Sequence, residues 1–205
     1  TYGILDAVFR HGFDRGPYRV PEPLDLDEPT HTIVEAGQRG KSLYDKLLAV
    51  SAREGVLLME MVASWLARYH DTGLRLSPAE DFLRSEERRV RGYVKRFHGC
   101  GHPHTKRAEA LAEIVLEAER RIVDGGVEGF VQGHGDFHPK NVLIGQDQAD
   151  DRSSMFVSAI DFESSQLCPR AYDVGTFLAQ FDNQLHEAPE VLARYPGRLF
   201  LESYH

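Results

Sequence analysis

The sequence contains few cysteines, no long apolar run and no excess of positive charge. Its two cysteines, Cys100 and Cys168, are far apart and stand in no metal-ligand spacing, so the sequence predicts reduced thiols and a cytoplasmic protein. No apolar stretch approaches the roughly 20 residues that cross a bilayer, and no membrane partner is expected. With 32 acidic residues against 24 Lys and Arg, the net charge of −8 argues against nucleic acid as a partner.

The rest of the composition is that of a globular chain with material for a sizeable core. The chain has 205 residues, of which 41% are hydrophobic and 27% are charged. Apolar residues at helical spacing predict long helices over residues 51–71, 79–97 and 102–123, and a last helix from about Pro189. In the third of these helices, the residues predicted to face inward are Leu111, Ile114, Val115 and Ile122. The predicted strands are few and short, so the fold class is expected to be α+β and mainly helical.

The most informative segment runs from His134 to Asn141 and reads H-G-D-F-H-P-K-N, and Asp161 follows downstream in I-D-F-E. In kinase chemistry, the Asp of H-x-D-x-x-x-x-N orients the attacking hydroxyl and accepts its proton, while the Asn and the second Asp hold the Mg²⁺ ions that bridge the phosphates. Two apolar runs, 142–144 and 155–160, flank a polar loop and predict two strands joined as a hairpin. Such a hairpin would bring Asn141 and Asp161 side by side at its mouth.

Two other interpretations of this segment are weaker. His134, Asp136 and His138 alternate, and on an extended strand all three would point the same way, as the ligands of a zinc or dinuclear hydrolase do. However, Pro139 interrupts such a strand, and the remaining histidines form no second cluster of ligands. A structural turn capped by His134 and Asp136 would leave the matching Asn141 and the I-D-F-E segment as two coincidences.

Protein kinases share the H-x-D-x-x-x-x-N skeleton, and residues 188–190 resemble their A-P-E element. Protein kinases, however, carry Arg where Gly135 stands and Lys where His138 stands. After Asp161 there is no room for an extended peptide-binding segment, because a helix is predicted almost at once, over residues 172–181. A protein kinase is therefore the weakest of the functional hypotheses.

The combination of H-G-D-F-H-P-K-N, I-D-F-E and Y-D-V-G-T-F-L closely resembles the aminoglycoside phosphotransferase and choline kinase-like family, which has a protein kinase-like fold. Upstream, residues 34–37 and 40–43 resemble the hinge of that family, and residues 66–70 resemble part of its first large helix pair. The resemblance spans almost the whole chain. It implies a phosphotransferase that uses Mg²⁺ and ATP, or GTP, to phosphorylate a hydroxyl of an aminoglycoside-, sugar- or amino-alcohol-like molecule.

The resemblance also implies roles for individual residues. Asp136 would be the catalytic Asp that contacts the substrate hydroxyl, and Asn141 and Asp161 would be the Mg²⁺ ligands. His134 would shape the catalytic loop. Asp173 would brace that loop from the following helix, although an Asp at this place is also an ordinary helix N-cap. The residues expected to contact the nucleotide are Ile33, Val34, Glu35 and Ala36, through their backbone groups, with His138 and Asn141.

Two parts that this family needs are not found in the sequence. There is no G-x-G-x-x-G, and the first Lys is Lys41, already past the hinge. The resemblance therefore implies that residues 1–36 are a remnant of the N-terminal lobe with the hinge, that residues 37–205 are the helical C-terminal lobe, and that the chain is truncated at both ends. Without a phosphate cradle, the chain alone is expected to be inactive or nearly so.

The alternative hypothesis is a non-catalytic nucleotide-binding or regulatory module of kinase-like fold, for which the strand Lys would be genuinely missing. The expected partners are a nucleotide and a small hydroxyl substrate. The sequence specifies neither the acceptor, nor the choice between ATP and GTP, nor the oligomeric state.

Overall fold

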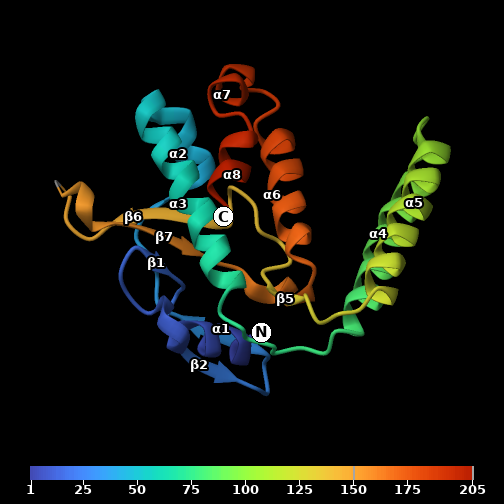
Figure 1. The fold of residues 1–205 in the computed structure, drawn as a ribbon, viewed down its shortest axis with the longest axis horizontal. Coiled ribbons are helices and arrows are strands. Elements are labelled where there is room, and N and C mark those ends of the chain that lie inside the picture. The colour runs from blue at the N-terminus through green and yellow to red at the C-terminus, as the bar shows by residue number, and fades with distance from the viewer. Residues whose placement is uncertain (150, 205) are drawn as a thin grey trace.

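The computed structural model describes residues 1–149 and 151–204; Asp150, in the predicted polar loop, and His205, at the end of the predicted C-terminal lobe, lie outside the described residues. The helices are α1 (Tyr2–Val8), α2 (Leu43–Ala49), α3 (Ala52–His70), α4 (Asp81–Gly99), α5 (Thr105–Asp124), α6 (Arg170–Gln184), α7 (Pro189–Arg194) and α8 (Arg198–Ser203). The strands are β1 (Tyr18–Arg19), β2 (Pro23–Asp27), β3 (Thr32–Glu35), β4 (Lys41–Ser42), β5 (Val131–Gly133), β6 (Val142–Gln146), β7 (Met155–Ala159) and β8 (Gln166–Cys168). The predicted α+β, mainly helical class is confirmed (Figure 1).

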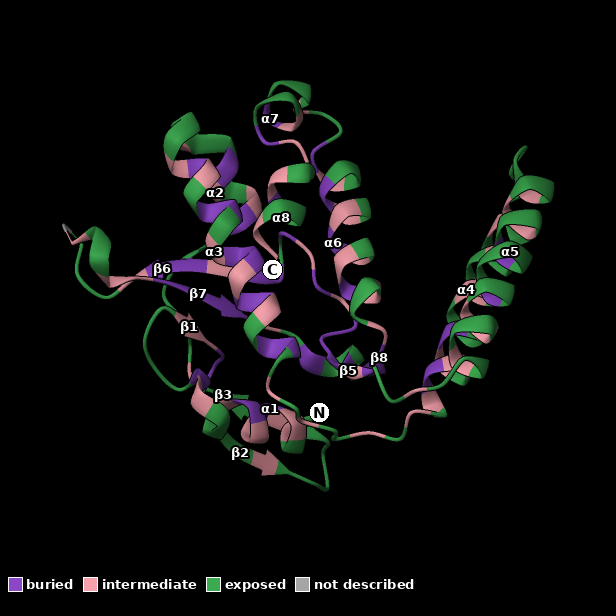
Figure 2. Ribbon diagram, viewed as in Figure 1, coloured by how far each residue is buried: buried purple, intermediate pink, exposed green. Residues whose placement is uncertain are grey.

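Helix α3 is the centre of the core. The Ser51 side chain caps its N-terminus by accepting a hydrogen bond from the Glu54 N–H. Its buried face lies against α8, β5 and β7, and Figure 2 shows buried residues along α3, β6 and β7. The buried apolar side chains of this helix are Leu58, Met59, Val62, Ala63, Trp65, Leu66 and Tyr69. The helix predicted over residues 51–71 is confirmed.

Strands β6 and β7 form the predicted antiparallel hairpin, in which Val142 pairs with Ala159. They occupy the middle of a four-stranded sheet of order β1-β7-β6-β4. Strands β2 and β3 form a separate antiparallel hairpin, and β5 pairs with β8. The catalytic-loop segment therefore connects two sheets, because it leaves β5 and enters β6.

Helices α4 and α5 form an antiparallel pair that projects away from the rest of the chain (Figure 1). The predicted inward face of α5 is wrong, because Leu111, Ile114, Val115 and Ile122 are between 42% and 65% exposed. Ala112 and Leu116 are the buried residues of this helix. Helix α5 packs mainly against α4, so only a narrow stripe of its surface is covered.

The predicted last helix is also wrong in detail, since it is divided into α7 and α8. Pro196 stands between them, and a proline within a helical pattern ends the helix before it. Among the helices of the described residues, none combines the length and the apolar character needed to cross a membrane.

Candidate active site

The catalytic loop is held in a conformation that requires glycine at position 135. Gly135 has a φ of +83°, and a Cβ built there would lie 1.9 Å from the carbonyl oxygen of Ser164. The loop is thus packed directly against the turn that follows Asp161. The Arg that protein kinases carry at this position has no space here, which argues further against that hypothesis.

Asp173, on α6, holds the backbone of the catalytic loop. Its carboxylate accepts the backbone N–H of His134 at 2.7 Å and of Gly135 at 2.8 Å, and His70 Nε2 lies 2.9 Å from the same group. Burial alone would raise the pKa of Asp173, but the hydrogen bond and charge of His70, with smaller contributions from His134 and Gly135, lower it below its ordinary value. The N-cap interpretation is wrong, because Pro169 is the N-cap of α6 and Asp173 lies inside the first turn.

His70 was not predicted from the sequence. It is a fully buried polar side chain in the last turn of α3, four residues after the buried Leu66. The available signal was its place on the apolar stripe of that helix, since a polar group on a buried face needs a hydrogen-bond partner.

The buried imidazole of His134 supports the catalytic loop through contacts of both ring nitrogens. Its Nε2 lies 3.0 Å from the carbonyl oxygen of Ile160, and its Nδ1 accepts the backbone N–H of Asp136. These two contacts define the neutral tautomer with the proton on Nε2. Burial, the largest influence, lowers the pKa of His134, so the ring stays neutral. The imidazole therefore links the catalytic loop to the residue before Asp161.

Asp136, Asn141 and His138 are in direct contact. The Asn141 side-chain Nδ2 donates to the Asp136 carbonyl oxygen at 3.1 Å and lies 3.4 Å from Oδ2 of the same residue. His138 Nε2 lies 3.6 Å from Asp136 Oδ2. The Asp136 side chain is 42% exposed, so its carboxylate is accessible from the surface. In the described part of the chain, no group of three His, Cys, Asp or Glu residues is placed to hold a metal ion.

Asn141 and Asp161 lie at the same mouth of the β6–β7 hairpin. The Ile160 N–H donates to the carbonyl oxygen of Asn141 at 3.0 Å, and Asp161 is the next residue. Asp161 has a left-handed φ of +67°, a conformation that costs free energy for a residue with a side chain and that often marks functional sites. The side-chain nitrogen of Asn141 donates to Asp136, so the side-chain oxygen of Asn141 is available to bind a cation. An amide oxygen and an exposed carboxylate are the donors that Mg²⁺ prefers, so the residues present fit this ion.

The predicted nucleotide-contacting residues Ile33, Val34, Glu35 and Ala36 lie on and just after β3, in a hairpin separate from the catalytic loop. The Ala36 N–H donates to the backbone carbonyl oxygen of Glu22 at 2.9 Å, which fixes the end of this hairpin. Although the Glu35 residue is largely exposed, partial desolvation and then the charge of Asp161 raise its pKa. The end of β3 is thus within electrostatic reach of the hairpin mouth.

A cavity of about 350 Å³ opens beside the catalytic loop. Gly135, Glu163 and Ser164 line one side of it, and α4 lines the other side with Asp81 and Glu86. The buried Glu86 carboxylate is satisfied by Arg89 and by the Tyr172 hydroxyl, which donates at 2.7 Å.

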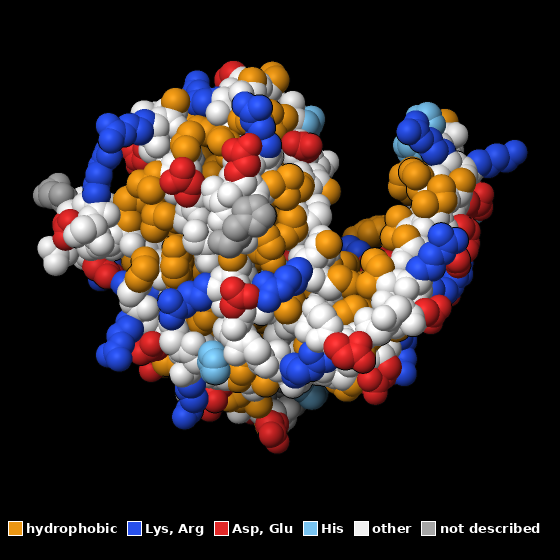
Figure 3. Space-filling model, viewed as in Figure 1, with side chains coloured by type: hydrophobic (Ala, Val, Ile, Leu, Met, Phe, Trp, Pro, Cys, Tyr) orange, Lys and Arg blue, Asp and Glu red, His pale blue; other side chains and the backbone are white. Residues whose placement is uncertain are grey.

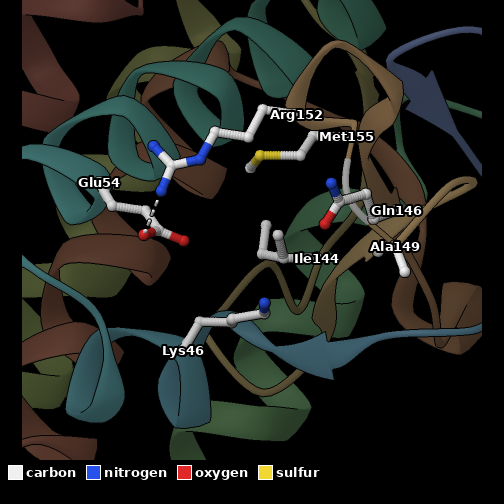
Figure 4. Close-up of a pocket in the computed structure, with 8 residues that line it drawn as sticks. Lys46, Glu54, Ile144, Gln146, Ala149, Arg152 and Met155 are labelled. Carbon is white, nitrogen blue, oxygen red and sulfur yellow. Dashed lines mark ion pairs between the residues drawn. The ribbon is translucent and has the colours of Figure 1, made fainter.

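A second cavity, of about 340 Å³, lies between the N-terminal turns of α3, helix α2 and the β6–β7 loop (Figure 4). Arg152 and Glu54 form an ion pair at 3.6 Å across it, and Lys46 lies on the opposite wall. No residue of the 134–141 loop lines this cavity, whereas Gly135 lines the first one, so the second cavity is not the candidate active site.

Comparison with known proteins places this arrangement in a family. A sequence model described as the phosphotransferase enzyme family matches residues 3–204. The chain belongs to this family. The predicted resemblance to aminoglycoside phosphotransferases and choline kinase-like enzymes is thereby confirmed. No curated protein matches the chain.

Solved structures share the fold at low identity. Glucosamine kinase in complex with glucosamine, ADP and inorganic phosphate is 18% identical to this chain, with a TM-score of 0.60. The match covers 99% of this chain and 56% of the glucosamine kinase chain. An ethanolamine kinase of Plasmodium vivax is 14% identical, with a TM-score of 0.58, and the match covers 98% of this chain and 55% of the ethanolamine kinase chain. An aminoglycoside phosphotransferase from Streptomyces rimosus, solved with ADP and streptomycin, is 17% identical and also has a TM-score of 0.58. This match covers 98% of this chain and 79% of the phosphotransferase chain. The kinase-like fold is confirmed, and the chain spans little more than half the length of the first two relatives.

Proposed function

We propose that this chain is the catalytic-loop portion of a small-molecule kinase that transfers the γ-phosphoryl group of ATP or GTP to a hydroxyl. Family membership gives a phosphotransferase in general. The observation that carries the finer proposal is the contact of Asn141 with Asp136 at the mouth of the hairpin that leads to Asp161. Two of these relatives, glucosamine kinase and the aminoglycoside phosphotransferase from Streptomyces rimosus, were solved with ADP, which supports nucleotide use.

In the proposed mechanism, Asp136 orients the acceptor hydroxyl and accepts its proton, because its carboxylate is exposed and held by Asn141. His134 and Asp173 keep the loop in place through its backbone. Asn141 and Asp161 would hold Mg²⁺, which supplies neutralisation of the phosphate charges. Because this chemistry depends mainly on positioning, the rigid bracing of the loop is the main contribution of these residues.

We infer that the cavity between α4 and the catalytic loop receives the acceptor. Gly135, at the edge of that cavity, directly precedes Asp136. Asp81 and Glu163 present carboxylates to it, which suits an ammonium group or several hydroxyls. Glucosamine and streptomycin, bound in two of the solved relatives, are molecules of this class. Sugar-, aminoglycoside- and amino-alcohol-like acceptors are accordingly the substrates to test first.

We further propose that the chain by itself has little activity and that the intact kinase acts in the cytoplasm. The chain spans 56% of the length of glucosamine kinase and contains no G-x-G-x-x-G to cover the phosphates. Its cysteines are both free thiols, in keeping with a reducing compartment.

The decisive experiment measures ADP release from Mg·ATP by the intact protein with a panel of these acceptors. Asp136→Ala is expected to lower turnover by at least ~10²-fold, the low end for a positioned general base. The exposed Asp182→Ala, on α6, serves as the matched control and should leave turnover unchanged. Full activity of Asp136→Ala would refute the proposal.

The non-catalytic alternative predicts a different outcome. It rests on the first Lys being Lys41, after the hinge. In that case Mg·ATP raises the melting temperature, because ligand at about 100 times its Kd adds roughly 2.7 kcal/mol, but no ADP is released with any acceptor. The enzyme hypothesis predicts both the thermal shift and ADP release.

A further inference from the structure

His138 has its two ring nitrogens committed to different partners. Its Nδ1 accepts the backbone N–H groups of Lys140 and Asn141, each at 3.2 Å. An Nδ1 that accepts hydrogen bonds carries no proton, so the proton of the neutral ring is on Nε2. The imidazole side chain is 15% exposed and is thus held within the loop.

The second ring nitrogen of His138, Nε2, lies near the carboxylate of Asp136, just outside hydrogen-bond distance. Nε2 lies 3.6 Å from Asp136 Oδ2, and Asn141 Nδ2 lies 3.4 Å from the same oxygen. One side-chain N–H therefore donates to Oδ2, and a second side-chain nitrogen lies 3.6 Å from it. In the described part of the chain, the other carboxylate oxygen of Asp136, Oδ1, has no hydrogen-bond partner.

We propose that His138 is a positioning residue, which together with Asn141 holds Oδ2 of Asp136 and thereby turns Oδ1 towards the acceptor hydroxyl. This inference rests on the proposed function. In the step it serves, the hydroxyl proton passes to Asp136 Oδ1, the hydroxyl oxygen forms a bond to the γ-phosphorus, and the bond from that phosphorus to the bridging oxygen breaks to release the nucleoside diphosphate. Contacts at catalytic groups commonly tighten once substrate is bound, so we expect the 3.6 Å separation to shorten in the complex with the acceptor.

A purely structural role for His138 needs only the contacts of Nδ1, whereas the positioning role also needs Nε2 beside Asp136 Oδ2. Two substitutions separate these roles. In His138→Asn, the side-chain oxygen can accept the same backbone N–H groups, so the turn is kept while the reach to Asp136 is lost. In His138→Gln, the longer amide can place an N–H donor near the former position of Nε2.

The activity test uses ADP release by the intact protein with an acceptor that it phosphorylates. His138→Asn is expected to lower kcat on the order of tenfold to a hundredfold, with the KM for ATP and the melting temperature unchanged, since misorientation of a reacting group by about 1 Å costs this much. His138→Gln should recover part of the loss. Wild-type turnover of His138→Asn, or a loss that appears in KM and melting temperature instead of kcat, would overturn the inference.

The outcome is distinguishable from failure of the proposed function. If Asp136→Ala retains full turnover, the proposed function fails. If Asp136→Ala is inactive while His138→Asn is fully active, only the positioning role of His138 fails.

A second measurement needs no activity. Two-bond ¹H–¹⁵N spectra of this chain report which ring nitrogen of each histidine carries the proton, and the His138→Asn spectrum assigns the signals of this residue. We expect Nδ1 of His138 to carry no proton and Nε2 to carry the ring hydrogen. A proton found on Nδ1 would overturn the inference, because Nε2 would then have no hydrogen to direct at Asp136.

Discussion

His70 Nε2 and the carboxylate of Asp173 are 2.9 Å apart, and both side chains are fully buried. The contact joins the end of α3 to the first turn of α6. Because the same carboxylate accepts the backbone N–H groups of His134 and Gly135, the core helix and the catalytic loop share one buried charge. Such a charge is tolerated in the interior only while its hydrogen bonds are made.

His70→Leu is therefore expected to destabilise the chain by about 3 kcal/mol, because it removes a donor from a buried carboxylate. His70→Gln, which retains an N–H donor, should lose less. Urea denaturation followed by circular dichroism measures both variants. Equal stability of His70→Leu and the wild type would show that the contact contributes nothing to the fold.

Asp161 illustrates a conflict between stability and function. Its φ of +67° is unfavourable for a residue with a side chain but not for glycine. Asp161→Gly is expected to stabilise the free chain by roughly 1 kcal/mol, or about 2–4 °C in Tm, offset in part by the greater freedom of glycine in the unfolded chain. The same variant should lose any rise in Tm caused by Mg·ATP.

The control for this prediction is Asp161→Asn, because Asn tolerates the left-handed region and has nearly the same shape but lacks the charge. Without nucleotide, the Tm of Asp161→Asn should equal that of the wild type. With Mg·ATP, its Tm should not rise, as in the glycine variant. A nucleotide-induced rise that survives in Asp161→Gly would remove Asp161 from the set of metal ligands.

The catalytic segment was predictable from the sequence because its chemistry depends on local spacing. The interval from Asp136 to Asn141 and the two apolar runs after it define a loop and a hairpin without reference to the rest of the chain, and the structure has both. The bracing from His70 was not predictable in this way, since a helix pattern shows that a polar side chain is buried but not which group it meets. For the same reason, the sequence suggested a local N-cap role for Asp173 and did not show its tertiary contact with His70.

Helix α5 shows a second limit of sequence patterns. Periodicity correctly predicted a helix, but it identified an apolar stripe without showing whether another element covers it. Ile114 belongs to that stripe and is 65% exposed, whereas Leu116 faces α4 and is buried. Hydrophobic side chains are visible over the projecting helix pair in Figure 3.

The corresponding prediction compares these two positions. Ile114→Ser is expected to change the free energy of unfolding by less than ~0.5 kcal/mol, as surface substitutions usually do. Leu116→Ala should cost about 2–5 kcal/mol, because it leaves a cavity between α4 and α5. Urea titrations of both variants test the observed packing. A larger loss for Ile114→Ser would mean that this face is covered in solution.

The helix pair also contains a carboxyl group that titrates near neutral pH. Burial first, and then the charge and hydrogen bond of Glu86, raise the pKa of Glu119 to about 7, while Arg89 acts in the opposite direction. One oxygen of Glu119, Oε2, is buried and has no hydrogen-bond partner in the described residues. A proton is therefore held more tightly by Glu119 in the folded chain than in the unfolded chain.

A raised pKa for an acid favours the folded state at low pH. The contribution of Glu119 is complete below its unfolded pKa of about 4.3 and is lost as the pH rises towards 7, where both carboxylates are charged and repel each other. Glu119→Gln can donate to Glu86 and cannot ionise, so it should melt at a higher temperature than the wild type at about pH 8 and at nearly the same temperature at about pH 4.5. The exposed Glu117→Gln, on the same helix, is the matched control and should show no such dependence on pH. Parallel melting curves for Glu119→Gln and the wild type across this range would show that Glu119 is already ionised in the folded chain.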